Sequence, residues 1–141
     1  MSTLYEATAT TVGGRTGHTA TDDNVLDLNL SKPVSMGGDG EVGTNPEQLL
    51  ACAYAACFGS GVKVIAEKMR IDIGDEYSVN AIIGFCKDDD GAYLEATLDC
   101  YIPGVDTKTG EKIIKMAHEI CPFSKATRDN ITVNLNLLLD E

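Results

Sequence analysis

The chain has 141 residues, of which 22 are Asp or Glu and 11 are Lys or Arg, giving a formal net charge of −11. A single domain over residues 1–141 is expected, since a chain near this length buries roughly two-thirds of the surface that its unfolded form exposes. The acidic balance argues against a nucleic-acid partner, because such a partner needs basic patches to neutralise phosphate. The first residues carry neither a basic nor an apolar region, so no secretory signal or membrane span is expected and the cytoplasm is the default.

The N-terminal part predicts strands and a turn. Residues 3–30 are rich in Thr, Val and Leu with partial alternation, which is typical of strands. The segment Gly13-Gly14-Arg15-Thr16-Gly17 interrupts them and predicts a glycine turn with Arg15 at its tip. A loop is expected from Ser31 to Gly43.

A long helix is predicted from Thr44 to about Met69. Its first residue stays open. Thr44 and Glu47 fit a capping box, whereas Asn45 offers an alternative start with Pro46 at the first helical position.

Apolar or small residues cover nearly every side of this helix between Leu49 and Phe58. A helix on the surface would not tolerate that pattern. We therefore expect the segment to be enclosed by a sheet or by another chain.

The second half of the chain predicts a hairpin, a helix and a strand. Residues 71–86 and 92–102 form the hairpin across Asp88-Asp89-Asp90-Gly91. Its apolar contributors are Ile82, Ile83, Phe85, Leu94, Leu98 and Ile102. A helix is expected from about Thr109 to Ile120, and a half-buried strand follows. The alternating apolar positions of that strand are Ile131, Val133, Leu135, Leu137 and Leu139. This order of elements indicates the α+β class.

Five cysteines without regular short spacing fit reduced thiols better than an extracellular disulfide framework. Cys57 ends the apolar helical run and is expected inside a buried helix, whereas Cys121 precedes Pro122 at a helix break, on a mobile corner. Two thiols in such unlike settings form a plausible redox pair. The other three cysteines are interpreted as small buried apolar residues, namely Cys52, Cys86 and Cys100.

A cysteine attacks as a nucleophile in its thiolate form, and a nearby positive charge favours that form. Arg15 is the candidate cation, and Glu47, in the first turn of the long helix, is the carboxylate that would orient it. The residues alone leave other readings open: Arg15 as a solvated turn residue, Glu47 as a capping residue, Cys57 as a core thiol and Cys121 as a helix-end residue. His18 and His118 lack metal-ligand spacing, so structural or surface roles are expected for both.

Five sequence segments, in order along the chain, help to choose between these alternative roles. They are Gly13-Gly14-Arg15-Thr16-Gly17, Gly43-Thr44-Asn45-Pro46-Glu47-Gln48-Leu49, Tyr54-Ala55-Ala56-Cys57-Phe58, Ala117-His118 and Cys121-Pro122-Phe123-Ser124. The set resembles the signature blocks of the organic hydroperoxide resistance (Ohr) proteins, which are thiol peroxidases of the osmotically inducible protein C (OsmC) family. Phe123, Lys125 and Cys52 depart from the usual pattern of that family.

The resemblance implies roles for four residues. Cys57 would be the peroxidatic cysteine, Arg15 its activating arginine, Glu47 the partner of that arginine and Cys121 the resolving cysteine. It also implies an intertwined homodimer with antiparallel sheets packed around long central helices. Glu47 and Cys57 are ten residues apart on one predicted helix, a rise of about 15 Å, so each site is expected to draw on two chains.

The resemblance further implies an organic hydroperoxide as substrate and dihydrolipoamide or a lipoylated protein as dithiol reductant, without a metal, flavin or haem cofactor. Candidate apolar walls for the substrate, each equally consistent with ordinary core, are Phe58, Phe123, Met36 and Tyr54. Two alternatives remain: an OsmC-branch peroxidase with a different peroxide preference, and a binding module on the same fold without catalysis.

Overall fold

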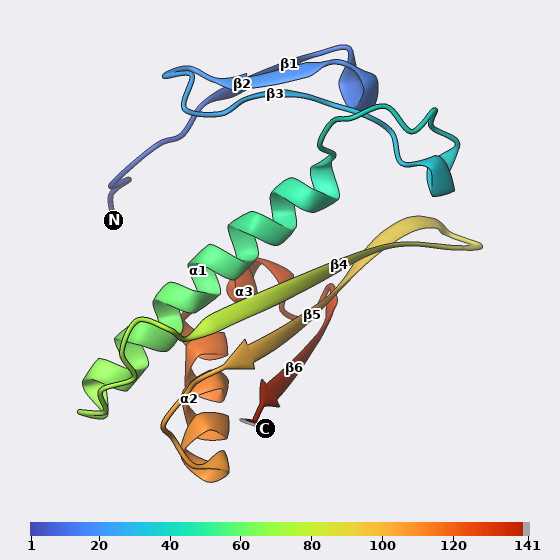
Figure 1. The fold of residues 1–141 in the computed structure, drawn as a ribbon. Helices are drawn as coiled ribbons and strands as arrows, with labels where there is room; N and C mark the ends of the chain where they lie inside the picture. Colours follow the sequence, from blue (N-terminus) through green and yellow to red (C-terminus); the bar gives the residue numbers. More distant parts are fainter. Residues whose placement is uncertain (140–141) are drawn as a thin grey trace. The chain divides into compact units, whose positions relative to one another are not determined.

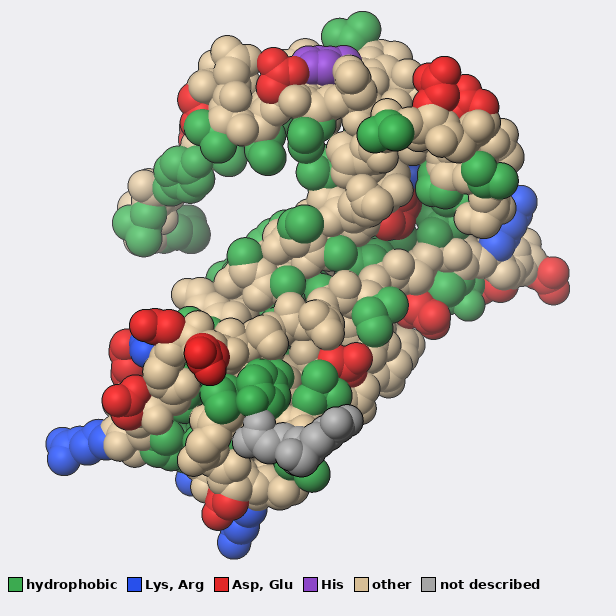
Figure 2. All heavy atoms as spheres, viewed as in Figure 1, with side chains coloured by type: hydrophobic (Ala, Val, Ile, Leu, Met, Phe, Trp, Pro, Cys, Tyr) green, Lys and Arg blue, Asp and Glu red, His purple; other side chains and the backbone are tan. Residues whose placement is uncertain are grey.

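The computed structural model describes residues 1–139. It divides into two compact units, Met1–Leu49 and the part from Leu50 onward, and each unit is described by itself. The expectation of a single domain stays a prediction. Acidic side chains are spread over the face drawn in Figure 2 and do not gather in one patch.

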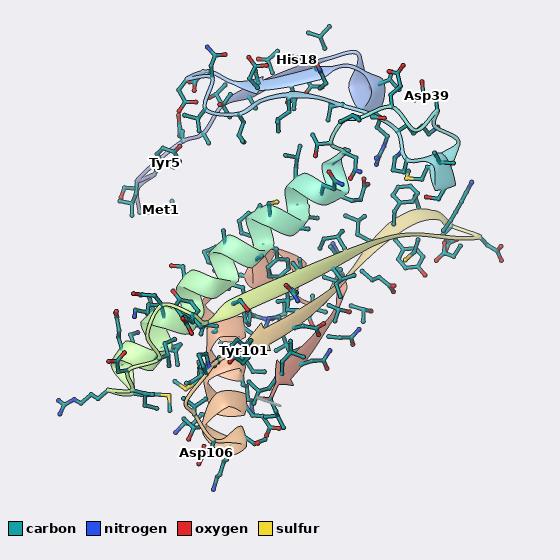
Figure 3. The ribbon with its side chains drawn as sticks, viewed as in Figure 1. Met1, Tyr5, His18, Asp39, Tyr101 and Asp106 are labelled. Carbon is teal, nitrogen blue, oxygen red and sulfur yellow. The ribbon has the colours of Figure 1, made fainter. Side chains whose placement is uncertain are left out.

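The first unit contains a three-stranded antiparallel sheet of β1 (Ala9–Val12), β2 (His18–Thr21) and β3 (Asp27–Asn29). This confirms the predicted strands. The turn between β1 and β2 holds one turn of 3-10 helix, η1 (Gly14–Thr16). Gly17 closes that turn so tightly that a Cβ there would lie 1.6 Å from the Val12 carbonyl oxygen, so no other residue fits this backbone. His18 is exposed and pairs with Asp27, a surface role (Figure 3).

The predicted loop follows β3. It contains a second 3-10 turn, η2 (Val34–Met36), and it returns beside the sheet through an isolated parallel bridge between Leu30 and Thr44. The bridge brings the chain to the start of the long helix.

Helix α1 (Pro46–Lys68) begins at the second of the two starts that the sequence allows. The Asn45 Oδ1 atom accepts a hydrogen bond of 2.8 Å from the Gln48 backbone N–H, which makes Asn45 the cap and Pro46 the first helical residue. The capping box is wrong, because the Thr44 hydroxyl donates to the Gln48 side chain instead. Glu47, freed from capping, can make other contacts.

The second unit contains a sheet in the order β4-β5-β6, with β4 (Ser78–Asp88) antiparallel to β5 (Gly91–Tyr101) and β5 parallel to β6 (Thr132–Leu138). The hairpin turns where predicted, since Asp88 pairs with Gly91 and the Gly91 φ of 124° suits glycine. The predicted first strand was too long at its start, because the chain turns at Gly74, with a φ of 66°, before β4 begins.

Two apolar residues of β4, both among the apolar contributors named from the sequence, are exposed in this chain. Ile82 is 54% exposed and Phe85 is 42% exposed. Alternation along the strand explains Ile82, because its neighbours Ala81 and Ile83 occupy the other face and pack toward the core. The sheet therefore presents an apolar side chain on each face.

Helices α2 (Thr107–Ile120) and α3 (Pro122–Thr127) lie with α1 on one side of this sheet (Figure 1). The Asp106 side chain caps α2 by accepting from the Thr109 N–H over 2.8 Å, which starts the helix two residues before its predicted beginning (Figure 3). The core between helices and sheet consists of buried residues including Tyr54, Phe58, Val62, Ile65, Leu98, Cys100, Ile113 and Ala117. The short helix α3 was missed by the sequence interpretation, which ended at a helix break.

Helix α1 is long and apolar enough to cross a membrane if length and composition alone are considered. Its Tyr54, Phe58, Val62 and Ile65 are buried in the core of the second unit. We interpret α1 as a core helix on that ground. Hydrophobic side chains also appear at the surface along α1 in Figure 2.

Candidate active site

In the first unit, Arg15 and Glu47 form a two-pronged ion pair. Arg15 Nη1 donates to Glu47 Oε2 over 2.9 Å and Nη2 donates to Oε1 over 2.7 Å. The planar guanidinium matches the carboxylate at both oxygens, which fixes the direction of both side chains. The pairing agrees with the contact expected from sequence, and the catalytic roles of the two residues stay predictions.

The glycine turn positions Arg15. Gly13 and Gly14 have φ angles of 84° and 57°, a region that side chains rarely tolerate. These two left-handed residues reverse the chain after β1 and place Arg15 in η1, while Asn45 caps α1 and leaves Glu47 in its first turn. Sequence-distant segments of the unit thus meet at one ion pair.

The ion pair also favours the charged form of both side chains. The hydrogen bonds from Arg15 are the largest cause that lowers the pKa of the Glu47 carboxyl, opposed by its partial burial. The same contact raises the pKa of Arg15. The guanidinium is partly exposed, so it can face a further group.

In the second unit, Cys57 of α1 and Cys121 lie side by side. The Cys121 thiol donates to the Cys57 sulfur over an Sγ–Sγ distance of 3.5 Å. A disulfide requires about 2.05 Å, so the two atoms are close enough to bond after a small displacement. Both cysteines are reduced in this structure.

The burial of the two thiols is the reverse of the expectation. Cys121, predicted on a mobile corner, is only 1% exposed, and Cys57, predicted inside a buried helix, is half-buried. The reason is local. Cys121 ends α2 with its N–H bonded to the Ala117 carbonyl, and α3 begins at the next residue, so the corner is fixed from both sides.

The surroundings of Cys57 raise its pKa. Burial is the largest cause, and the neighbouring Cys121 thiol raises it further, whereas a hydrogen bond from the Phe123 backbone lowers it. The Phe123 contact comes from the first turn of α3, where backbone N–H groups have no helical partner. Taken together, these contacts favour the protonated form of the Cys57 thiol.

The remaining cysteines differ from one another. Cys100 is buried, as expected, and burial with the charge of Asp99 raises its pKa to about 12. Cys86 is half-buried on β4. Cys52 is exposed, so its interpretation as a buried residue is wrong for this chain.

The predicted substrate walls fall into two groups. Tyr54 and Phe58 are 1% and 0% exposed and belong to the core of the second unit, so they present no surface to a ligand in this chain. Phe123 is half-buried with its ring centroid 5.9 Å from that of Tyr54. Met36 is half-buried in the first unit. Contact with a substrate stays a prediction for all four.

Sequence reasoning missed a cluster of polar side chains behind Cys121. The Tyr54 hydroxyl is 2.8 Å from Ser124 Oγ, which is 2.7 Å from His118 Nδ1. Pro122 directly after Cys121 was the signal for α3, because proline favours the first helical position. Nothing in the sequence indicates that Ser124 would meet Tyr54 and His118. Within residues 1–139, no group of three His, Cys, Asp or Glu side chains is placed to hold a metal ion.

The sequence model of the family described as OsmC-like protein matches residues 37–136. The chain belongs to the OsmC-like family.

Relatives of this OsmC-like chain carry a more specific name. The organic hydroperoxide resistance protein of Xanthomonas axonopodis pv. citri is 40% identical over 134 residues, which is 95% of this chain and 94% of the relative. The crystal structure of the organic hydroperoxide resistance protein OhrB of Bacillus subtilis matches with a TM-score of 0.90 at 38% identity, covering 96% of this chain and all of that one. An organic hydroperoxide resistance protein from Elizabethkingia anophelis, with thiocyanate bound, matches with a TM-score of 0.92 at 38% identity over 99% of this chain and 100% of that chain. Within the OsmC-like family, the chain groups with the Ohr proteins.

Proposed function

We propose that this chain is a thiol peroxidase that reduces organic hydroperoxides to alcohols, with Cys57 as the attacking thiol and Cys121 as the resolving thiol. The observation that carries the proposal is the 3.5 Å between the two sulfur atoms. Relatives at about 40% identity are named organic hydroperoxide resistance proteins, which supports the substrate class.

The proposed cycle has three steps. The Cys57 thiolate attacks the distal oxygen of ROOH, the O–O bond breaks, and the departing alkoxide takes a proton to leave as ROH. The sulfenic acid that remains condenses with the Cys121 thiol, which forms the S–S bond and releases water. A dithiol reductant, proposed to be dihydrolipoamide or a lipoylated protein, then reopens the disulfide by exchange and is itself oxidised to a disulfide.

Activation of Cys57 requires a cation. Because its surroundings raise the pKa of Cys57, the thiol would remain mostly protonated at neutral pH without further help. We propose Arg15 as the source of that charge. Glu47 holds the guanidinium through both Nη1 and Nη2, so binding of a thiolate would not require Arg15 to be reoriented.

We further propose an intertwined homodimer with α1 at its centre. The α1 side chains Cys52 and Ala56 are exposed in the isolated chain although this part of the helix is apolar, and all four residues of β1 are exposed. A second chain would cover such surfaces. Glu47 and Cys57 are ten residues apart along α1, about 15 Å of rise, so we propose that Arg15 and Glu47 serve the Cys57 of the partner chain.

A peroxide-consumption assay tests the function. Purified protein is mixed with cumene hydroperoxide or hydrogen peroxide and with dihydrolipoamide as reductant, and the loss of peroxide is followed. We expect faster turnover of the organic hydroperoxide and no turnover by Cys57→Ser, with Cys86→Ser as the matched control that retains activity. A preference for hydrogen peroxide would indicate the other OsmC-branch peroxidase, and absence of turnover in the wild type would overturn the proposal.

A further inference from the structure

Four buried or half-buried side chains from three helices form a chain of hydrogen bonds in the second unit. His118 Nδ1 of α2 is 2.7 Å from Ser124 Oγ of α3, which is 2.8 Å from the Tyr54 hydroxyl of α1. The Tyr54 hydroxyl is also 3.3 Å from Thr127 Oγ1, which donates to the Ser124 carbonyl over 3.0 Å. None of these four side chains has a role in the catalytic cycle proposed above.

Counting protons fixes the direction of every bond in the chain. Thr127 donates its only hydroxyl proton to the Ser124 carbonyl, so its oxygen accepts a hydrogen bond from the Tyr54 hydroxyl. Tyr54 has then used its own proton and accepts from Ser124, and Ser124 in turn accepts from His118. His118 must therefore carry a proton on Nδ1, which assigns its tautomer.

The Nδ1 donor is present in both charge states of His118. Burial, followed by the charge of Arg128, lowers the pKa of His118, with Glu119 opposing. Protonation would add a proton at Nε2 and leave the bond to Ser124 in place. The chain of hydrogen bonds is thus a fixed structural link at any pH near neutrality.

This link ends one residue from the groups that contact Cys57. Ser124 is 0% exposed and follows Phe123, whose backbone N–H lowers the pKa of the Cys57 thiol. Cys121 and Pro122 precede Phe123, so these residues and Ser124 form one short turn. A helix of six residues has few internal bonds to hold it, and side-chain anchors therefore decide its position.

We propose that Ser124, held by His118 and Tyr54, is a positioning residue that fixes the Phe123 N–H and the Cys121 thiol against Cys57. The proposal rests on the proposed function, since it concerns the site where Cys57 would ionise and form its disulfide. A hydrogen bond to a thiolate is effective only at short distance and good angle, so a small shift of α3 weakens it. The same shift would move Cys121 away from Cys57.

The test measures the ionisation of each cysteine without peroxide. Iodoacetamide alkylation is followed by peptide mass spectrometry across pH 5–10, which gives an apparent pKa for Cys57 and, in the same sample, for Cys86 as internal reference. Two variants, Tyr54→Phe and His118→Leu, each remove one side-chain group from the series of hydrogen bonds. A third, His118→Asn, keeps an N–H donor near the Nδ1 position. Tyr77→Phe removes a tyrosine hydroxyl elsewhere in the unit as a matched control.

Because the Cys121 thiol itself raises the pKa of Cys57, the variants are compared in a Cys121→Ala background, where that contribution is absent. There we expect Tyr54→Phe and His118→Leu to raise the apparent pKa of Cys57 and slow its alkylation at pH 7 about threefold to tenfold, the range for weakening one hydrogen bond to an ionised group. His118→Asn should restore most of the wild-type profile, and Tyr77→Phe and the reference Cys86 should not change. Loss of stability alone would not move the profile of one cysteine and spare the other.

Unchanged Cys57 alkylation in folded Tyr54→Phe would overturn the positioning role, and so would a His118→Asn profile identical to that of His118→Leu. If His118→Leu does not fold, Tyr54→Phe decides, because it keeps the aromatic ring in the core. A wild-type protein that consumes no hydroperoxide would defeat the proposed function and leave this alkylation result readable, so the two failures are distinguishable.

Discussion

The sulfur atoms of Cys57 and Cys121 are 3.5 Å apart although the residues are separated by 64 positions in the sequence. The contact depends on α1 packing against the junction of α2 and α3 in the core of the second unit. Only about 1.5 Å of approach is needed to reach disulfide length. The proposed resolving thiol is therefore already beside Cys57, which has two consequences that can be measured.

The first consequence concerns which disulfide bond forms on oxidation. One equivalent of an organic hydroperoxide should join Cys57 to Cys121, because no other cysteine pair is expected to compete at this distance. Non-reducing peptide mass spectrometry would identify the bridge. A dominant bridge that contains the exposed Cys52 would contradict this prediction.

The second consequence is that Cys57 and Cys121 should respond differently to substitution. Cys121→Ser should consume roughly one equivalent of hydroperoxide and then stall or overoxidise, because the Cys57 sulfenic acid finds no partner. Cys57→Ser should consume none, since no thiolate remains to attack. Stoichiometric titration of peroxide measures both. Equal loss of the first equivalent in the two variants would count against these assignments.

Reactivity toward alkylation should follow burial among the remaining cysteines. With a pKa of about 12, Cys100 holds about one thiolate in ten thousand molecules at pH 8, and it is also shielded from reagent. Peptide-resolved iodoacetamide labelling should modify Cys100 last and the exposed Cys52 far earlier. Labelling in urea should remove the difference, and rapid labelling of Cys100 in folded protein would show that the core opens.

The Arg15–Glu47 pair predicts a pH dependence of stability. The pKa of Glu47 is lower in the folded protein than in the unfolded chain, so the pair stabilises above the unfolded value of about 4.3 and loses this contribution as pH falls through the folded value. The free energy of unfolding lost in Glu47→Gln should be largest at pH 6–7 and shrink below about pH 4.

Urea denaturation at fixed protein concentration measures the difference between wild type and Glu47→Gln at each pH. Glu41→Gln makes the same change of charge at an exposed position of the same unit and should have a small effect throughout. A loss in Glu47→Gln that does not vary with pH would mean that the carboxylate charge contributes nothing.

Sharing of the site between chains is tested by complementation. Inactive Cys57→Ser and inactive Arg15→Ala subunits are mixed, and formation of heterodimers is checked by native mass spectrometry. If Arg15 acts across the interface, one of the two sites is complete and about half of the wild-type activity per dimer returns. No recovery in verified heterodimers would assign Arg15 to its own chain, and a fully active monomer would exclude a shared site.

Local signals in the sequence were enough for most of the fold. Alternation of apolar residues located β6, because the period of a strand is set within a few residues. The helix expected from about Thr109 to Ile120 corresponds to α2. The ordered sequence segments also indicated the family. The cap of α1 needed the structure, since Asn45 and Thr44 are both good capping residues and only the bond from Gln48 distinguishes them.

The site depended on packing that no local pattern carries. The sequence marked Cys57 and Cys121 as chemically interesting but inverted their burial, because exposure is decided by which elements cover a residue. Ser124 became a buried anchor only because α1 and α2 bring Tyr54 and His118 to it. The residue types set the available chemistry, and the tertiary contacts between helices decided which thiols and hydroxyls can act together.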